Sequence, residues 1–226
     1  MFNGFSDDTV RFFLDLKFHN ESVFFHENHQ RYIEYVQKPF YELINDLAPY
    51  MLKIDPLMEI RPNKCLAHIH RDTRFTKDKS PYRDHLWLLF RRQAEPREKA
   101  LNYFFEFGLD TIGWGMGFWG ENREALDLFR KQIVAYPDEI SGMITDINMI
   151  KRSLVLEGTV HKRIDIPPGV NESLKRWYCT KEMYICKDNP PYRSAFSDKL
   201  INELRSDFQA LAPLYRKLRG YCDELD

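Results

Sequence analysis

"LNYFFEFGLDTIGWGMGFWG", residues 101–120, is the stretch that decides the fold class. Its first part is a short apolar and aromatic run and its second part alternates without a break, so both parts are typical of β-strands. Only a short turn separates them, which favours an antiparallel pair. We therefore predict a mainly antiparallel sheet built around this stretch.

The second of these strands has one face made of glycine. The residues on that face are Gly113, Gly115 and Gly117. A face without side chains permits very close approach by a helix, by another backbone or by a ligand. We favour close structural packing over a ligand wall.

Further strands and helices are expected on both sides of this stretch. The expected strands are "CLAHIHR" (65–71), "HLWLLFR" (85–91), "SLVLEG" (153–158) and "EMYICKD" (182–188). Ser6 is expected to cap one helix and Asn20 to begin a second, in which Pro39 either kinks the helix or lies in the first turn of a new one. Helical spacing returns over 121–150 and again from Ser197. The prediction is an α+β fold with N-terminal and C-terminal helices covering the sheet, in a single domain over 1–226.

Composition limits the classes of function. The chain has 226 residues and a formal net charge of −1, so it is not a basic nucleic-acid binder as a whole. Charged residues interrupt every apolar run before the roughly 18 residues needed to cross a bilayer, which excludes membrane insertion. The four cysteines have no zinc or redox spacing and no secretion signal is present, so a cytoplasmic location is expected.

"RDTRFTKDKSPYR", residues 71–83, is the segment that can carry chemistry. It is expected to be a loop between two strands, where scaffolds often place binding groups. Five cations against two carboxylates give it a charge of +3. Arg and Lys recognise phosphate or carboxylate. Phe75 is expected to anchor the loop, which preorganises it for an anion.

A structural role is the alternative for this loop. Asp72 and Asp78 can pair with the neighbouring cations, which would make the loop an internal ion-pair clamp within a protein-interaction or structural module. Cations that converge on an open pocket would favour binding, whereas cations that are each paired with a carboxylate would favour the clamp.

Other chemistry-bearing residues are secondary candidates. His68 and His70 are two apart on an expected strand and so share a face, but hydrogen-bonded histidines are more common than a metal site, and we assign no metal. Asn28 and Tyr32 lie one helical turn apart. No glycine-rich phosphate loop, dinucleotide fingerprint or nucleophile elbow is present, so no cofactor is expected.

The long motif carries a resemblance. "RDTRFTKDKSPYR" resembles the hallmark Arg-Asp-x-Arg-Phe-Ser/Thr-x-Asp-Lys-x-Pro-Tyr-Lys of a widespread, mainly bacterial family with fungal members, known as a domain of unknown function, with Arg83 in place of the usual Lys. The family's upstream aromatic pair, Asn and Tyr are matched by Phe24, Phe25, Asn28 and Tyr32. The resemblance covers nearly the whole chain. It implies a one-domain architecture and assigns no activity, cofactor or partner.

Together these observations predict binding of an anionic ligand, phosphate-bearing or nucleic-acid-like. The residues assigned to the site are Arg71, Asp72, Arg74, Lys77, Asp78, Lys79, Tyr82, Arg83, Asn28, Tyr32, His68 and His70. The partners left open are an anionic small molecule, a nucleic acid or a second copy of the chain in a homodimer. An enzymatic version would use Asp72 or a histidine as general base, a choice that the sequence leaves open.

Overall fold

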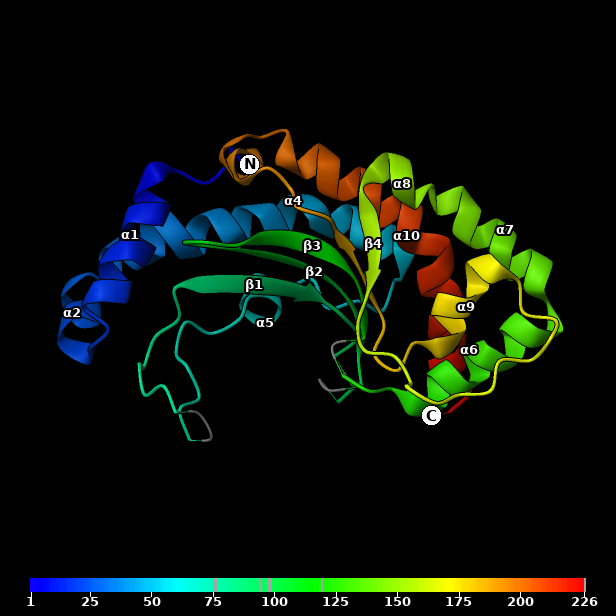
Figure 1. Cartoon of the computed structure of the whole chain (residues 1–226). Helices are drawn as coiled ribbons and strands as arrows, with labels where there is room; N and C mark the ends of the chain where they lie inside the picture. Colours follow the sequence, from blue (N-terminus) through cyan, green and yellow to red (C-terminus); the bar gives the residue numbers. More distant parts are fainter. Residues whose placement is uncertain (75–76, 94, 97–98, 119, 226) are drawn as a thin grey trace. The chain divides into compact units, whose positions relative to one another are not determined.

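The computed structural model describes residues 1–74, 77–93, 95–96, 99–118 and 120–225 (Figure 1). The fold class is α+β, as predicted, with a five-stranded antiparallel sheet in the order β1-β2-β3-β5-β4 and with helices at the N-terminal and C-terminal ends. The strands are β1 (His85–Phe90), β2 (Leu101–Gly108), β3 (Ile112–Phe118), β4 (Leu154–Glu157) and β5 (Tyr184–Lys187).

The chain forms two compact units, each built from several segments. Unit 1 comprises Met1–Phe90, Phe104–Trp114 and Asn189–Arg205. Unit 2 comprises Arg91–Tyr103, Gly115–Asp188 and Ser206–Asp226. The strands β2 and β3 and the C-terminal helix α10 (Leu200–Asp223) each contribute residues to both units. The single-domain organisation stays a prediction.

Unit 1 holds the N-terminal helices. They are α1 (Asp7–Phe18), α2 (Ser22–Glu27), α3 (His29–Tyr32), the π-helix η1 (Ile33–Gln37), α4 (Lys38–Ile54) and α5 (Pro62–Cys65). The unit also holds the 3-10 helix η2 (Tyr192–Phe196), which precedes α10 in the chain. Ser6 is the N-cap of α1, as predicted, and its backbone N–H donates to the Thr9 hydroxyl at 3.2 Å. Pro39 lies in the first turn of α4, directly after the π-helical turn, so the second of the two expected arrangements is the one found.

The N-cap of the second helix lies one residue later than predicted. Glu21 is the N-cap of α2, and Asn20 lies outside the helix. The Asn20 side chain instead pairs with the Tyr82 backbone: its Nδ2 donates to the Tyr82 carbonyl at 3.0 Å, and its Oδ1 accepts from the Tyr82 N–H at 2.9 Å. The Asn20 amide, which the local sequence predicts to cap the helix, is therefore used in a long-range contact instead.

The core of unit 1 is aromatic. The Phe5 ring contacts Phe40 of α4 at a centroid distance of 4.8 Å and Phe107 of β2 at 4.5 Å. In β1, Leu86 and Leu88 are fully buried, whereas the alternate positions are half-buried. Because side chains alternate across a strand, one face of β1 belongs to this core, and the other carries His85, Trp87 and Leu89.

The expected strand over 65–71 is wrong. Cys65 ends α5, and among the described residues the segment after it forms two isolated bridges, Leu66 with Leu88 of β1 and His70 with Tyr82. The Ala67 N–H also donates to the Trp87 carbonyl at 2.9 Å. The segment therefore runs antiparallel to β1 without forming a continuous ladder, and it covers part of that edge of the sheet.

Unit 2 contains four further helices and the contact between the glycine face of β3 and the strand β5. The helices are α6 (Arg123–Ala135), α7 (Pro137–Ile147), α8 (Met149–Arg152) and α9 (Glu172–Cys179), of which α9 was not predicted. Gly115 lies opposite Cys186 of β5. A Cβ added at Gly115 would lie 2.0 Å from the Ile185 carbonyl oxygen, and one at Gly117 would lie 2.3 Å from that of Met183. The predicted close packing by another backbone is confirmed at these two glycines.

Among the described residues, no helix combines the length and the apolar character needed to cross a membrane.

Candidate functional site

The basic segment 71–83 forms a hairpin with a fixed base in unit 1. The Arg71 N–H donates to the Pro81 carbonyl at 2.8 Å, and the Arg83 N–H donates to the Ile69 carbonyl at 3.0 Å. The bridge between His70 and Tyr82 lies between these two bonds. In Figure 1 the segment between α5 and β1 projects away from β1. We call residues 71–83 the basic hairpin.

Tyr82 anchors this base. Its side chain is 4% exposed, and its ring stacks on Phe25 of α2 with centroids 4.3 Å apart and an interplanar angle of 20°. The Asn20 amide holds the Tyr82 backbone on both its N–H and its C=O. A buried ring and a bidentate amide together fix the point from which the hairpin projects. Phe75, the anchor expected from sequence, lies outside the described residues.

Two ion pairs lie within the hairpin. Arg74 binds Asp72 in a bidentate manner, with Nε and Nη2 at 3.0 and 2.8 Å from the two carboxylate oxygens. Arg71 pairs with Asp78. The Arg74 and Asp72 side chains are 77% and 51% exposed, so water competes with this pair and its net contribution to stability is small.

The lysines of the hairpin are exposed. Lys79 donates from Nζ to the Thr73 carbonyl at 2.8 Å, and Lys77 is an exposed residue. The hairpin therefore presents a net positive charge of +3 on a short segment whose carboxylates are themselves at the surface. Such an arrangement can hold an anion, because an external anion can replace an aspartate of the hairpin as the partner of an arginine.

The hairpin carboxylates have lowered pKa values. Hydrogen bonds from the Arg74 side chain and backbone bring the pKa of Asp72 to about 2. For Asp78, hydrogen bonds from the backbone and side chain of Ser80, followed by that from Arg71, bring the pKa to about 2. Because both folded pKa values lie below the ordinary 3.8, these contacts are complete above about pH 4 and are lost as the pH falls towards 2.

The Arg74→Gln protein tests this pairing. We expect the carboxyl carbon of Asp72, followed by NMR, to titrate near pH 2 in the wild type and closer to 3.8 in the variant. Asp78 is the internal control, since Ser80 holds it, and its midpoint should stay near 2. Equal midpoints for Asp72 in the two proteins would contradict the ion pair.

A second cluster lies on the face of β1 and β2 that points away from the aromatic core, next to the hairpin base. His85 lies between two carboxylates: its Nδ1 is 2.9 Å from Asp84 Oδ1 and its Nε2 is 3.7 Å from Glu106 Oε1. Burial raises the pKa of Glu106. The Arg83 guanidinium lies over the Trp87 ring, 4.8 Å from its centroid.

Only part of this cluster was predicted. Arg83 was assigned to the site, whereas Trp87 and Glu106 were not. The sequence did contain a signal for both residues. Side chains alternate across a strand, so Trp87 lies on the same face as Arg83, and Glu106 on the same face as Asn102, opposite the core.

The family of the chain is shown by its match to a family model. The model of the conserved hypothetical protein family DUF2461 matches residues 8–216. The chain belongs to this family. The match spans the basic hairpin, the β1 and β2 cluster and most of α10, and it confirms the family resemblance expected from sequence as far as the domain of unknown function. A comparison with curated proteins finds no match.

The two helical residues that were assigned to the site are engaged within the N-terminal helices of this DUF2461 protein. The Asn28 Nδ2 donates to the Phe24 carbonyl at 2.9 Å, and its Oδ1 accepts from Arg31 at 2.9 Å. Tyr32 is 6% exposed, and its burial raises the pKa of its hydroxyl to about 12. Their participation in ligand binding stays a prediction.

The two histidines lie on the arm that leads into the hairpin. His68 and His70 are exposed and flank the buried Ile69. Because the expected strand is absent there, their position on a shared face stays a prediction. The His70 ring lies 5.0 Å from that of Tyr82. Within the part of the chain that the structure describes, no three His, Cys, Asp or Glu side chains are grouped to hold a metal ion.

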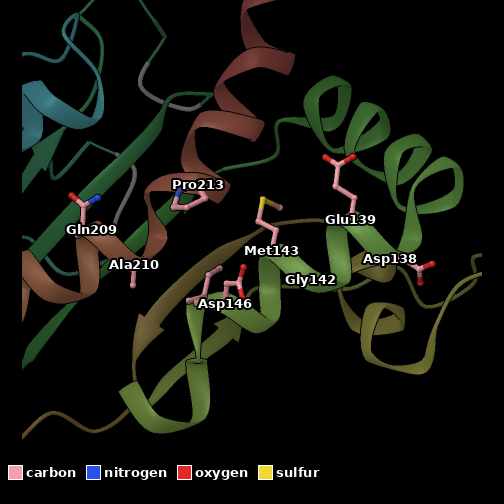
Figure 2. Close-up of a pocket in the computed structure, with 9 residues that line it drawn as sticks. Asp138, Glu139, Gly142, Met143, Asp146, Gln209, Ala210 and Pro213 are labelled. Atoms are coloured by element: carbon pink, nitrogen blue, oxygen red, sulfur yellow. The ribbon is translucent and has the colours of Figure 1, made fainter.

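A groove of about 520 Å³ lies between α7 and α10 in unit 2 (Figure 2). It is lined by Met143, Pro213 and three carboxylates, those of Asp138, Glu139 and Asp146. The carboxylates make this groove repel anions. None of the residues assigned to the ligand site lines it, so it is separate from the candidate site at the basic hairpin.

Proposed function

We propose that this DUF2461 protein binds a phosphate-bearing anionic ligand through the basic hairpin. The single observation that carries the proposal is a fixed base combined with exposed cations. Backbone bonds, the Phe25 stack and the Asn20 amide hold the base, while Arg74, Lys77 and Lys79 are at the surface. A cationic segment with a fixed base loses little conformational freedom when a ligand binds.

The internal carboxylates set the strength of this binding. A phosphate that approaches Arg74 or Arg71 must displace an exposed aspartate, and an exposed pair contributes only about 0–1 kcal/mol to stability. A phosphate carries more charge than a carboxylate and offers more acceptor oxygens to the guanidinium. The exchange is therefore favourable for a ligand with several phosphates, which contacts several cations at once.

A second function is supported by the same ion pairs. Arg71 and Arg74 are each paired with a carboxylate inside the hairpin, which is the arrangement expected of a structural clamp. In that case the hairpin would serve as a rigid projection within a protein-interaction module, and its charges would be satisfied internally. The two functions predict opposite responses to added phosphate.

Binding of inorganic tripolyphosphate separates the two functions. We expect the wild-type protein to bind it and to melt about 5–10 °C higher at a hundred times the dissociation constant, where binding adds about 2.7 kcal/mol. The Arg74→Gln/Lys77→Gln/Lys79→Gln protein should bind at least about tenfold more weakly. In a plot of the logarithm of the binding constant against the logarithm of the salt concentration, the slope for this variant should be shallower by about 2–3. This is close to one unit for each lost phosphate contact.

The control is a protein with the same loss of charge elsewhere. Lys131, Lys151 and Lys162 are exposed lysines of unit 2, and their replacement by Gln should leave tripolyphosphate affinity within about twofold of the wild type. Equal losses in the two triple variants would mean that only net charge matters. If the wild type shows no shift with tripolyphosphate, the structural clamp is the better account of the hairpin.

A further inference from the structure

The surface next to the hairpin base combines a cation with two aromatic rings. Arg83, His85 and Trp87 occupy alternate positions leading into and along β1, so they share one face. The Arg83 guanidinium lies 4.8 Å from the Trp87 ring centroid, and the His85 ring centroid lies 5.8 Å from it. Planar cationic and aromatic groups of this kind are surfaces on which nucleic-acid bases stack.

This surface is continuous with the hairpin. Arg83 closes the hairpin base through its N–H bond to Ile69 and also covers Trp87. Lys77 lies six residues before Arg83, which corresponds to at most about 20 Å of extended chain. A short single strand that carries phosphates along its length can therefore contact both the lysines of the hairpin and Trp87.

Hydrogen-bond acceptors adjoin the His85 ring. Asp84 and Glu106 flank His85 on its two nitrogens, and carboxylates accept hydrogen bonds from the exocyclic amino groups of bases. The carboxylates would repel a phosphate, so this surface suits the base of a nucleotide rather than its phosphate.

We infer that the ligand of the basic hairpin is a single-stranded nucleic acid, whose backbone follows the hairpin cations and one of whose bases stacks beside Arg83 on Trp87. The inference rests on the proposed function and adds the chemical class of the ligand to it. A duplex keeps its bases stacked on one another and cannot offer one to Trp87, whereas a single strand can. A mononucleotide offers its phosphate at one end only, whereas a strand offers a phosphate at each nucleotide to the several cations of the hairpin.

The test compares ligands and Trp87 variants by fluorescence anisotropy with a labelled 12-nucleotide single strand. We expect the single strand to bind more tightly than tripolyphosphate, a mononucleotide or the same sequence as a duplex. Stacking on one aromatic ring contributes about 1–3 kcal/mol per base, so Trp87→Leu should weaken binding of the strand about 5- to 150-fold. Trp87→Phe, which keeps a ring, should stay within about threefold of the wild type.

Two further readouts keep the test decisive. Tripolyphosphate affinity should be the same in Trp87→Leu and in the wild type, which also reports that the variant is folded. The strand should quench tryptophan fluorescence in a Trp119→Phe protein and much less in the Trp87→Phe/Trp119→Phe protein, because the remaining tryptophans, Trp114 and Trp177, are buried and cannot stack on a base.

The outcomes distinguish this inference from the proposed function. If tripolyphosphate binds through the hairpin but the strand binds no better and Trp87→Leu has no effect, the proposed function stands and the single-strand inference is overturned. Preference for the duplex would overturn the inference as well. If neither the strand nor tripolyphosphate binds, both proposals fail.

Discussion

The Gly115→Ala protein is expected to melt roughly 5–15 °C below the wild type. An added methyl group at Gly115 would lie 2.0 Å from the Ile185 carbonyl oxygen, and the atoms in the way belong to the backbone of β5. Backbone that is hydrogen-bonded in a sheet cannot rotate aside as a flexible side chain can. We expect a loss of about 2–4 kcal/mol in the free energy of unfolding, since the strands β3 and β5 must separate to admit the methyl group.

Gly113→Ala is the matched control for this prediction. Gly113 lies on the same face of β3, but no atom lies within 4 Å of a Cβ added there. Its free energy of unfolding should change by less than about 0.5 kcal/mol, measured for both proteins by urea denaturation. A loss of equal size at the two glycines would contradict the close approach of β5 to β3, because β-strand propensity alone would then account for both values.

The Asp207→Ala protein is expected to lose about 3–5 kcal/mol of stability. The Asp207 side chain is 5% exposed, and its two oxygens lie 3.1 Å from Lys187 Nζ and 3.3 Å from Arg152 Nη1. Removing the carboxylate would leave two cations close together in a poorly solvated place. Because α8, β5 and α10 meet at this aspartate within unit 2, the repulsion would act on all three elements.

Two comparisons isolate the effect of the buried charge. Asp207→Asn keeps a hydrogen-bond acceptor and should cost less than Asp207→Ala. Glu172→Ala breaks an exposed pair with Lys175 on α9 and should change the free energy of unfolding by less than about 0.5 kcal/mol. Urea unfolding curves at pH 7 give all three values, and a loss below about 1 kcal/mol for Asp207→Ala would contradict the buried ion pair.

Much of the fold could be predicted from local pattern. All five strands of the described sheet were predicted. The strands β1, β2 and β3 are each long enough to show alternation or a continuous apolar run, and β4 and β5 lie within the expected strands 153–158 and 182–188. The glycine face of β3 also predicted the close approach of a backbone, since a missing side chain has a direct geometric meaning.

The failures have physical causes. The segment 65–71 alternates between apolar and polar residues but forms isolated bridges instead of a strand. Its first residue belongs to α5, and its last residue begins the basic hairpin. Asn20 is a residue type that often caps helices, but its side-chain amide is hydrogen-bonded to the backbone of Tyr82, which is distant in sequence. The helix α9 was missed because Leu174 and Trp177 are its buried residues, too few to show a period after a turn-rich segment.

The candidate site was predictable in composition and less so in geometry. The concentration of cations at 71–83 is visible in the sequence, and so is the motif that places the chain in its family. The pairing of Arg74 with Asp72 and of Arg71 with Asp78 depends on how the hairpin folds back. The stack of Tyr82 on Phe25 joins residues that are 57 positions apart, which no local pattern encodes.

The most direct test of the central claim is an NMR titration of the ¹⁵N-labelled protein with inorganic tripolyphosphate. We predict that the largest shifts fall on the backbone amides of 71–83 and on the arginine side-chain signals of the basic hairpin, and that they saturate with one ligand per chain. Shifts that fall elsewhere, or an absence of shifts at millimolar tripolyphosphate, would contradict the claim that the basic hairpin is an anion-binding site.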